Sequence, residues 1–111
     1  MSHRLIERSD ALVVQLAGDI DLDNSPAARK VLLDVVQRSR PVFVDLSAVT
    51  YIDSSGIASL IEAFQRARTV GVQFMLTDVA EPVMRVLSLA RLDRVLPIGS
   101  LPHGGLQQSS E

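Results

Sequence analysis

The segment that most constrains the fold is residues 42–64, where a strand pattern changes directly into a helix pattern. Residues 42–46 have the β-branched and aromatic content of a buried strand. After residues 47–52 comes the polar quartet Asp53-Ser54-Ser55-Gly56. Residues 57–64 then repeat apolar side chains at the i, i+3, i+4, i+7 spacing of a helix face. The quartet is therefore predicted to lie at a strand-to-helix junction.

Asp53 suits the N-cap position of this helix. Its carboxylate can accept the backbone N–H of Ser55 or Gly56, which have no partner in the first helical turn. Ser54 and Ser55 would then stand at the positive end of the helix dipole. Two hydroxyl groups in this place are typical either of a plain capped helix or of a modification site, and the residues alone favour the plain helix.

The segments before the quartet predict two strands and a helix. Strands are expected over residues 5–8 and 11–17, joined as a hairpin, and an acidic loop is expected over residues 18–24. Ser25 and Pro26 predict a helix over residues 26–37 with the serine as its N-cap. Asp19 and Asp23 are expected to be solvated loop residues.

The segments after the quartet continue the alternation of helices and strands. The quartet helix is predicted to end at Gly71, with Glu62 and Arg66 paired on its exposed side. A strand follows over residues 72–77, then a helix from residue 81, and an edge strand over residues 95–98. Tyr51 and Ile52 are expected in the core or at its edge.

This order of elements predicts one α/β domain over residues 1–98. Its central sheet is expected to be mostly parallel, with four to five strands and with helices packed on it. The length of 111 residues leaves no room for a second domain. Residues 99–111 are predicted to form a mobile tail. Because sites in such sheets favour loops at the carboxyl ends of strands, the acidic loop and the quartet are expected to face each other.

Composition argues against several classes of function. The formal net charge is -2 and the sequence has no basic patch, so binding to nucleic acid is not expected. No apolar run is long enough to insert directly into a membrane, so a cytoplasmic protein is predicted. The chain has no cysteine, and its two histidines, His3 and His103, lie near opposite ends. With no base near the serines and no metal-binding or phosphate-binding motif, neither catalytic residues nor metal nor cofactor are predicted, and the protein is not expected to be an enzyme.

Residues 44–57 resemble the signature of the STAS domain family, and specifically that of bacterial anti-sigma factor antagonists. Residues 83–95 are similar to the last helix and turn of that family, and Gly18-Asp19-Ile20-Asp21 adds to the likeness. The resemblance covers nearly the whole chain up to Ile98. Arg91 departs from the pattern, because relatives often have glycine at this helix end, and the conformation of that turn is therefore in question.

The resemblance implies a phosphorylation-controlled partner switch. In that family the unmodified antagonist binds an anti-sigma factor that is also a serine kinase, and the kinase inactivates the antagonist by phosphorylating a serine at the start of the second helix. Carried over to this chain, the phosphoacceptor is Ser54, with Ser55 as the second choice. The implied partner-binding residues are Asp21, Asp53, Ser54, Ser55 and Gly56. A cognate phosphatase is a further implied partner.

Two alternatives from other classes remain open. One is a STAS accessory subunit of a bacterial phospholipid-transport ABC complex, and the other is a STAS domain that senses a small molecule or nucleotide through the loops at the strand ends. Ser54 beside Asp53 favours the switch, because a purely structural cap needs only the aspartate.

Overall fold

The computed structural model describes residues 1–100. Its elements, in chain order, are β1 (Ser2–Glu7), β2 (Leu12–Ile20), α1 (Ser25–Val36), β3 (Val42–Ile52), α2 (Ser54–Val70), β4 (Phe74–Thr77), α3 (Glu81–Leu89), the 3-10 helix η1 (Leu92–Arg94) and β5 (Ile98–Gly99). The spatial order of the strands follows the chain, with β1 antiparallel to β2 and the other neighbours parallel. The predicted α/β domain with a mostly parallel sheet is confirmed.

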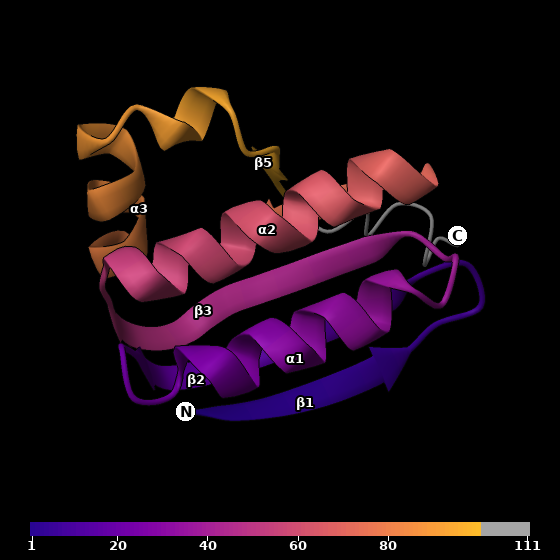
Figure 1. Ribbon diagram of the computed structural model, residues 1–111, viewed down its shortest axis with the longest axis horizontal. Helices are drawn as coiled ribbons and strands as arrows, with labels where there is room; N and C mark the ends of the chain where they lie inside the picture. Colours follow the sequence, from indigo (N-terminus) through magenta and orange to yellow (C-terminus); the bar gives the residue numbers. More distant parts are fainter. Residues whose placement is uncertain (101–111) are drawn as a thin grey trace.

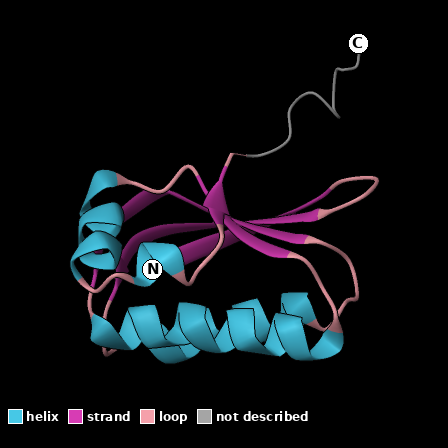
Figure 2. Ribbon diagram, turned by 90° about the horizontal axis from the view of Figure 1, so that it is seen from above, coloured by secondary structure: helices cyan, strands magenta, loops and turns pink. Residues whose placement is uncertain are grey.

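The helices are distributed unevenly over the sheet. Helices α1 and α2 lie side by side and form one layer on a single face (Figures 1 and 2). Helix α3 stands beside β3 at the end of the sheet where α2 begins (Figure 1), and the N–H of Ala80 donates to the Leu46 carbonyl at 3.3 Å. The start of α2 therefore lies at the carboxyl end of β3, at the same end of the sheet as α3.

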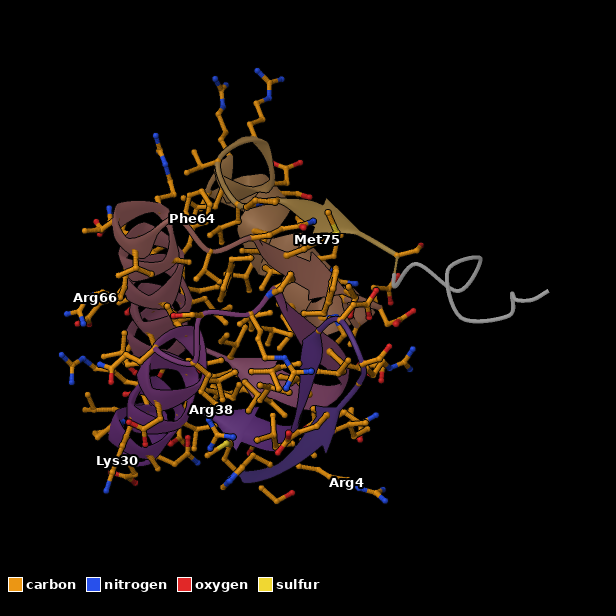
Figure 3. The ribbon with its side chains drawn as sticks, turned by 90° about the vertical axis from the view of Figure 1, so that its right-hand side faces the viewer. Arg4, Lys30, Arg38, Phe64, Arg66 and Met75 are labelled. Carbon is orange, nitrogen blue, oxygen red and sulfur yellow. The ribbon has the colours of Figure 1, made fainter. Side chains whose placement is uncertain are left out.

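The main core lies between the sheet and the layer of α1 and α2. Successive side chains of a strand point to opposite faces, so alternate residues of β2 and β3 reach the helices. Figure 3 shows Phe64 on the inner side of α2 and Arg66 on its outer side, and the Phe64 ring lies 6.1 Å from that of Phe74. The strand residues of this core include Leu12, Val14, Leu16, Val42, Val44 and Leu46, all exposed by 1% or less.

The two central strands are longer than predicted. Strand β3 continues through residues 47–52, and β2 continues through residues 18–20, which were expected to begin the acidic loop. The two extensions pair with each other, for example Ile20 with Ile52. One of the register shifts between the strands falls directly after Gly18, whose φ is 85°. Asp19 is therefore a strand residue, and it accepts the Thr50 hydroxyl at 2.6 Å.

The extension of β3 also sets the burial of Tyr51 and Ile52. Ile52 is buried, as expected, whereas Tyr51 is 52% exposed and the expectation that it lies in the core or at its edge is wrong. The physical reason is the alternation of the strand, which turns neighbouring side chains to opposite faces. Tyr51 consequently presents much of its ring to solvent close to the quartet.

The helix ends follow the local rules with some shifts. The prediction for α2 is confirmed, because Asp53 caps its start and Gly71 ends it in the left-handed conformation with φ of 76°. Helix α1 begins one residue earlier than predicted, so its N-cap is Asn24 and Ser25 is a buried helix residue. Arg91 adopts φ of 60° and ψ of 23°, so this turn keeps the left-handed conformation that glycine favours.

The last two strands are shorter than predicted. Strand β4 begins at Phe74, and the predicted strand over residues 95–98 is replaced by β5 at Ile98–Gly99, which occupies the sheet edge as expected. Gly99, the first residue of the predicted tail, therefore belongs to a strand. The rest of that tail, from residue 101, lies outside the described residues.

Candidate functional site

The β3–α2 junction is organised by one oxygen of Asp53. Oδ1 accepts the backbone N–H groups of Ser55 at 2.9 Å and Gly56 at 3.2 Å, and also the Ser55 hydroxyl at 2.6 Å. The hydroxyl bond is the main cause that lowers the pKa of Asp53, and the backbone N–H groups lower it further against an opposing effect of desolvation. Asp53 is thus a well-held carboxylate that keeps its charge at neutral pH.

The other oxygen of Asp53 joins the junction to the β2–α1 loop. Oδ2 accepts the backbone N–H of Leu22 at 3.1 Å, and the N–H of Asp53 donates to the Ile20 carbonyl at 3.2 Å. The loop and the quartet therefore face each other, as the sequence predicted. Asp53 fixes both the start of α2 and the position of the loop opposite it.

The two serines of the quartet differ in how their hydroxyl groups are used. Ser54 is the first residue of α2 and is exposed, and within residues 1–100 its side chain makes no hydrogen bond. Ser55 is half-buried, and its hydroxyl donates to Asp53. The hydroxyl of Ser54 is consequently free to react with a group that arrives from solvent, whereas that of Ser55 is occupied.

Gly56 lets the start of α2 approach the strand ends closely. A Cβ atom at this position would lie 2.6 Å from the Ile20 carbonyl oxygen and 2.6 Å from Cγ1 of Ile52. These distances are too short for any carbon atom in a relaxed structure. Gly56 is buried, so a role for it in partner binding is indirect, through the position that it gives to the neighbouring serines.

Asp21 builds the β2–α1 loop. Its Oδ1 accepts the N–H groups of Asp23 at 3.1 Å and Asn24 at 3.2 Å, and its carbonyl accepts the N–H of Ser25 at 2.8 Å. In return, Asn24 Oδ1 accepts the N–H of Asp21 at 2.9 Å. Part of the Asp21 carboxylate is therefore committed within the loop, which sequence reasoning did not foresee.

Sequence reasoning also missed Leu22, which the loop holds with 73% of its surface exposed. The signal that could have found it is an apolar residue placed between two aspartates in a loop beside the quartet. Leu22 is thus a candidate contact residue of the site.

The exposed charges of α1 and α2 pair across the helices. Arg29 donates from Nε and Nη2 to the two carboxylate oxygens of Glu62, both at 2.7 Å. This ion pair lowers the pKa of Glu62 and raises that of Arg29. The predicted pair of Glu62 with Arg66 does not form as a salt bridge in residues 1–100, although the charge of Arg66 also lowers the pKa of Glu62.

Two features are absent from the described residues, a metal-binding cluster and a helix that could span a membrane. Residues 1–100 contain no cluster of histidine and carboxylate groups that could hold a metal ion. None of the helices within this range is long and apolar enough to cross a membrane. The site itself presents the free hydroxyl of Ser54 beside the fixed carboxylate of Asp53.

Comparison with known proteins agrees with this architecture. The family model of the STAS domain matches residues 3–102. The chain belongs to the STAS domain family. The anti-sigma-B factor antagonist of Bacillus subtilis is 24% identical over 101 residues, which are 91% of this chain and 93% of the relative. The resemblance to the STAS domain family found in the sequence is confirmed. The relative from Bacillus subtilis carries the name of an anti-sigma factor antagonist.

Two solved structures show the same fold. The crystal structure of an anti-sigma factor antagonist from Mycobacterium paratuberculosis has a TM-score of 0.81 and 25% identity, and covers 96% of this chain and 92% of its own. The phosphorylated form of the Bacillus cell fate determinant SpoIIAA has a TM-score of 0.69 and 12% identity, and covers 98% of this chain and 100% of its own. Both likenesses cover at least 96% of this chain.

Proposed function

We propose that this protein is an anti-sigma factor antagonist that works as a phosphorylation-controlled partner switch. The unmodified form binds an anti-sigma factor with serine kinase activity, and phosphorylation of Ser54 weakens that complex. The single observation that carries the proposal is the free, exposed hydroxyl of Ser54 beside the fixed carboxylate of Asp53. The names of the relatives and the phosphorylated form of a structural neighbour support it.

The hydrogen bonds of the quartet favour Ser54 over Ser55 as the acceptor. A kinase must bring the γ-phosphate of ATP in line with a hydroxyl oxygen and accept the proton of that hydroxyl. The Ser55 hydroxyl already donates a hydrogen bond to Asp53 Oδ1 at 2.6 Å, and Ser55 is half-buried. Phosphorylation of Ser55 would have to break this bond, whereas Ser54 needs no rearrangement.

A phosphate on Ser54 would act mainly on the partner. It adds roughly 1.5 to 2 negative charges, which the positive end of the α2 dipole favours and the charge of Asp53 opposes. Asp53 already binds the N–H groups of Ser55 and Gly56, so few free donors remain for the phosphate within the chain. In a complex with the kinase, the new phosphate would lie against the nucleotide that supplied it, where like charges repel.

This role makes the protein a regulator and a kinase substrate instead of an enzyme. A phosphatase that removes the phosphate from Ser54 would restore binding. Because the reaction needs ATP and a kinase that controls a sigma factor, the proposal places the protein in the cytoplasm.

The test is phosphorylation by the anti-sigma kinases of its own genome, measured by mass spectrometry. We expect the wild-type protein and Ser55→Ala to gain the mass of one phosphate, and Ser54→Ala to gain none while it still binds the kinase. Undiminished labelling of Ser54→Ala would refute the choice of acceptor. Absence of labelling and of kinase binding in the wild type, together with co-purification of a transporter ATPase, would instead support an accessory transport subunit.

A further inference from the structure

Leu22 differs from other large exposed apolar residues, such as Leu89 and Val70, because its N–H donates to Asp53, the residue next to Ser54. The loop of residues 21–24 is closed by hydrogen bonds from Asp21 and Asn24 to each other, and from the N–H of Asp23 to Asp21. The N–H of Leu22 itself is held by Asp53. An exposed leucine alone is common on protein surfaces, but the bond to Asp53 places this one beside the proposed phosphoacceptor.

A rigid exposed leucine is well suited to bind a partner. Association usually loses affinity because loops and side chains must be ordered at the interface. The backbone of Leu22 needs no such ordering, since its loop is closed before the partner arrives. Most of the leucine surface is exposed, so a partner can still remove it from water.

The charges around Leu22 indicate the chemistry of the surface that fits it. Asp21 and Asp23 flank Leu22 in the chain, and Asp53 accepts its backbone N–H. Asp23 is exposed, and its backbone N–H, not its carboxylate, is the group used within the loop. Within residues 1–100 no hydrogen bond or salt bridge satisfies the Asp23 carboxylate, so a partner that covers the leucine must bring a positive group to it, because burying unpaired charge is unfavourable.

We infer that Leu22 is the apolar anchor through which the unmodified protein binds its partner, and that the partner receives it in an apolar pocket with lysine or arginine at the rim. The inference rests on the proposed function, since the partner is the anti-sigma kinase that acts on Ser54. Asp21 and Asp53 are then positioning residues that hold the anchor beside the phosphoacceptor. The same loop would thus place Ser54 correctly for the kinase.

The first test compares Leu22→Ala with Val70→Ala. Val70 is 50% exposed at the far end of α2, about 24 Å along the helix from Ser54, so it is a control for the loss of exposed apolar surface. Binding to each purified anti-sigma kinase of the same genome is measured by calorimetry with ADP present. We expect Leu22→Ala to bind about tenfold more weakly and Val70→Ala to stay within about twofold of the wild type.

The second test examines the rim with Asp23→Asn and its control Asp34→Asn, an exposed aspartate of α1. We expect Asp23→Asn to associate more slowly and to lose part of the salt dependence of the association rate, while Asp34→Asn behaves as the wild type. Wild-type affinity in Leu22→Ala, or an equal loss in Val70→Ala, would overturn the inference while the switch survives. A wild-type protein that neither binds nor is phosphorylated by any of these kinases would overturn the proposed function itself, and the inference with it.

Discussion

The close approach of α2 to the strand ends makes Gly56→Ala a sensitive test of the site's geometry. The added Cβ would lie 2.6 Å from the Ile20 carbonyl oxygen, 2.6 Å from Cγ1 of Ile52 and 2.9 Å from Cγ2 of Ile20. One of these atoms belongs to the backbone of a central strand, so it cannot rotate away as a flexible side chain could. The helix end must therefore move away from β2 and β3.

The expected change in the free energy of unfolding follows from two opposing effects. Forcing an extra carbon into a packed core costs about 1 to 3 kcal/mol, and the carbonyl contact places Gly56→Ala at the upper end of that range. The higher helix propensity of alanine returns at most about 1 kcal/mol. The net loss is about 2 kcal/mol, which for a domain of this size lowers the melting temperature by about 8 to 16 °C.

A matched control is Gly71→Ala, which changes the same residue types at the other end of α2. Gly71 has nothing within 4 Å of its added Cβ, so only its left-handed φ of 76° is unfavourable for alanine. We expect a loss of about 1 kcal/mol there, and no effect on kinase labelling of Ser54. Thermal unfolding followed by circular dichroism measures both variants. If Gly56→Ala were as stable as the wild type, the helix would not lie where the structure places it.

Two further predictions concern Asp53 and Asp21. In the folded protein the pKa of Asp53 lies below its ordinary value of 3.8. The charged carboxylate therefore stabilises the fold above pH 3.8, and this stabilisation is lost as the pH falls through the lower folded pKa. Asp53→Asn should remove this effect and flatten the acid side of the curve of stability against pH. Asp53→Asn should also speed hydrogen exchange at the Leu22 amide, and unchanged protection there would contradict the bond to Oδ2. Asp21→Lys should weaken kinase binding more than Arg66→Glu on the outer side of α2, as calorimetry would show, and equal effects would count against the site.

The features that could be predicted from the sequence are those set by neighbouring residues. Asp53 and the two N–H groups that it caps are at most three positions apart, and Gly71 ends α2 through its own backbone freedom. The alternation of strand and helix patterns likewise fixed the class of the fold. Such local preferences agree with the final structure because no distant contact opposes them.

The features that could not be predicted depend on contacts between distant segments. Residues 49–52 are all strand formers, but Ser47 and Ala48 interrupt the pattern after residue 46. The strand continues across this interruption because residues 17–20 pair with residues 48–52. The ion pair of Arg29 with Glu62 exists only once α1 lies beside α2. The bond from the Leu22 N–H to Asp53 joins residues 31 positions apart, so no local pattern could predict that the loop is held against the quartet.

The central claim is that phosphate on Ser54 controls partner binding without unfolding the domain. The most direct measurement is a calorimetric titration of the anti-sigma kinase with the unmodified protein and with the protein phosphorylated on Ser54, alongside melting curves of both forms. We predict a dissociation constant 10-fold to 100-fold larger for the phosphorylated form, on the order of 1.4 to 2.8 kcal/mol, with little change in melting temperature. Equal dissociation constants for the two forms, or a large fall in the melting temperature on phosphorylation, would contradict it.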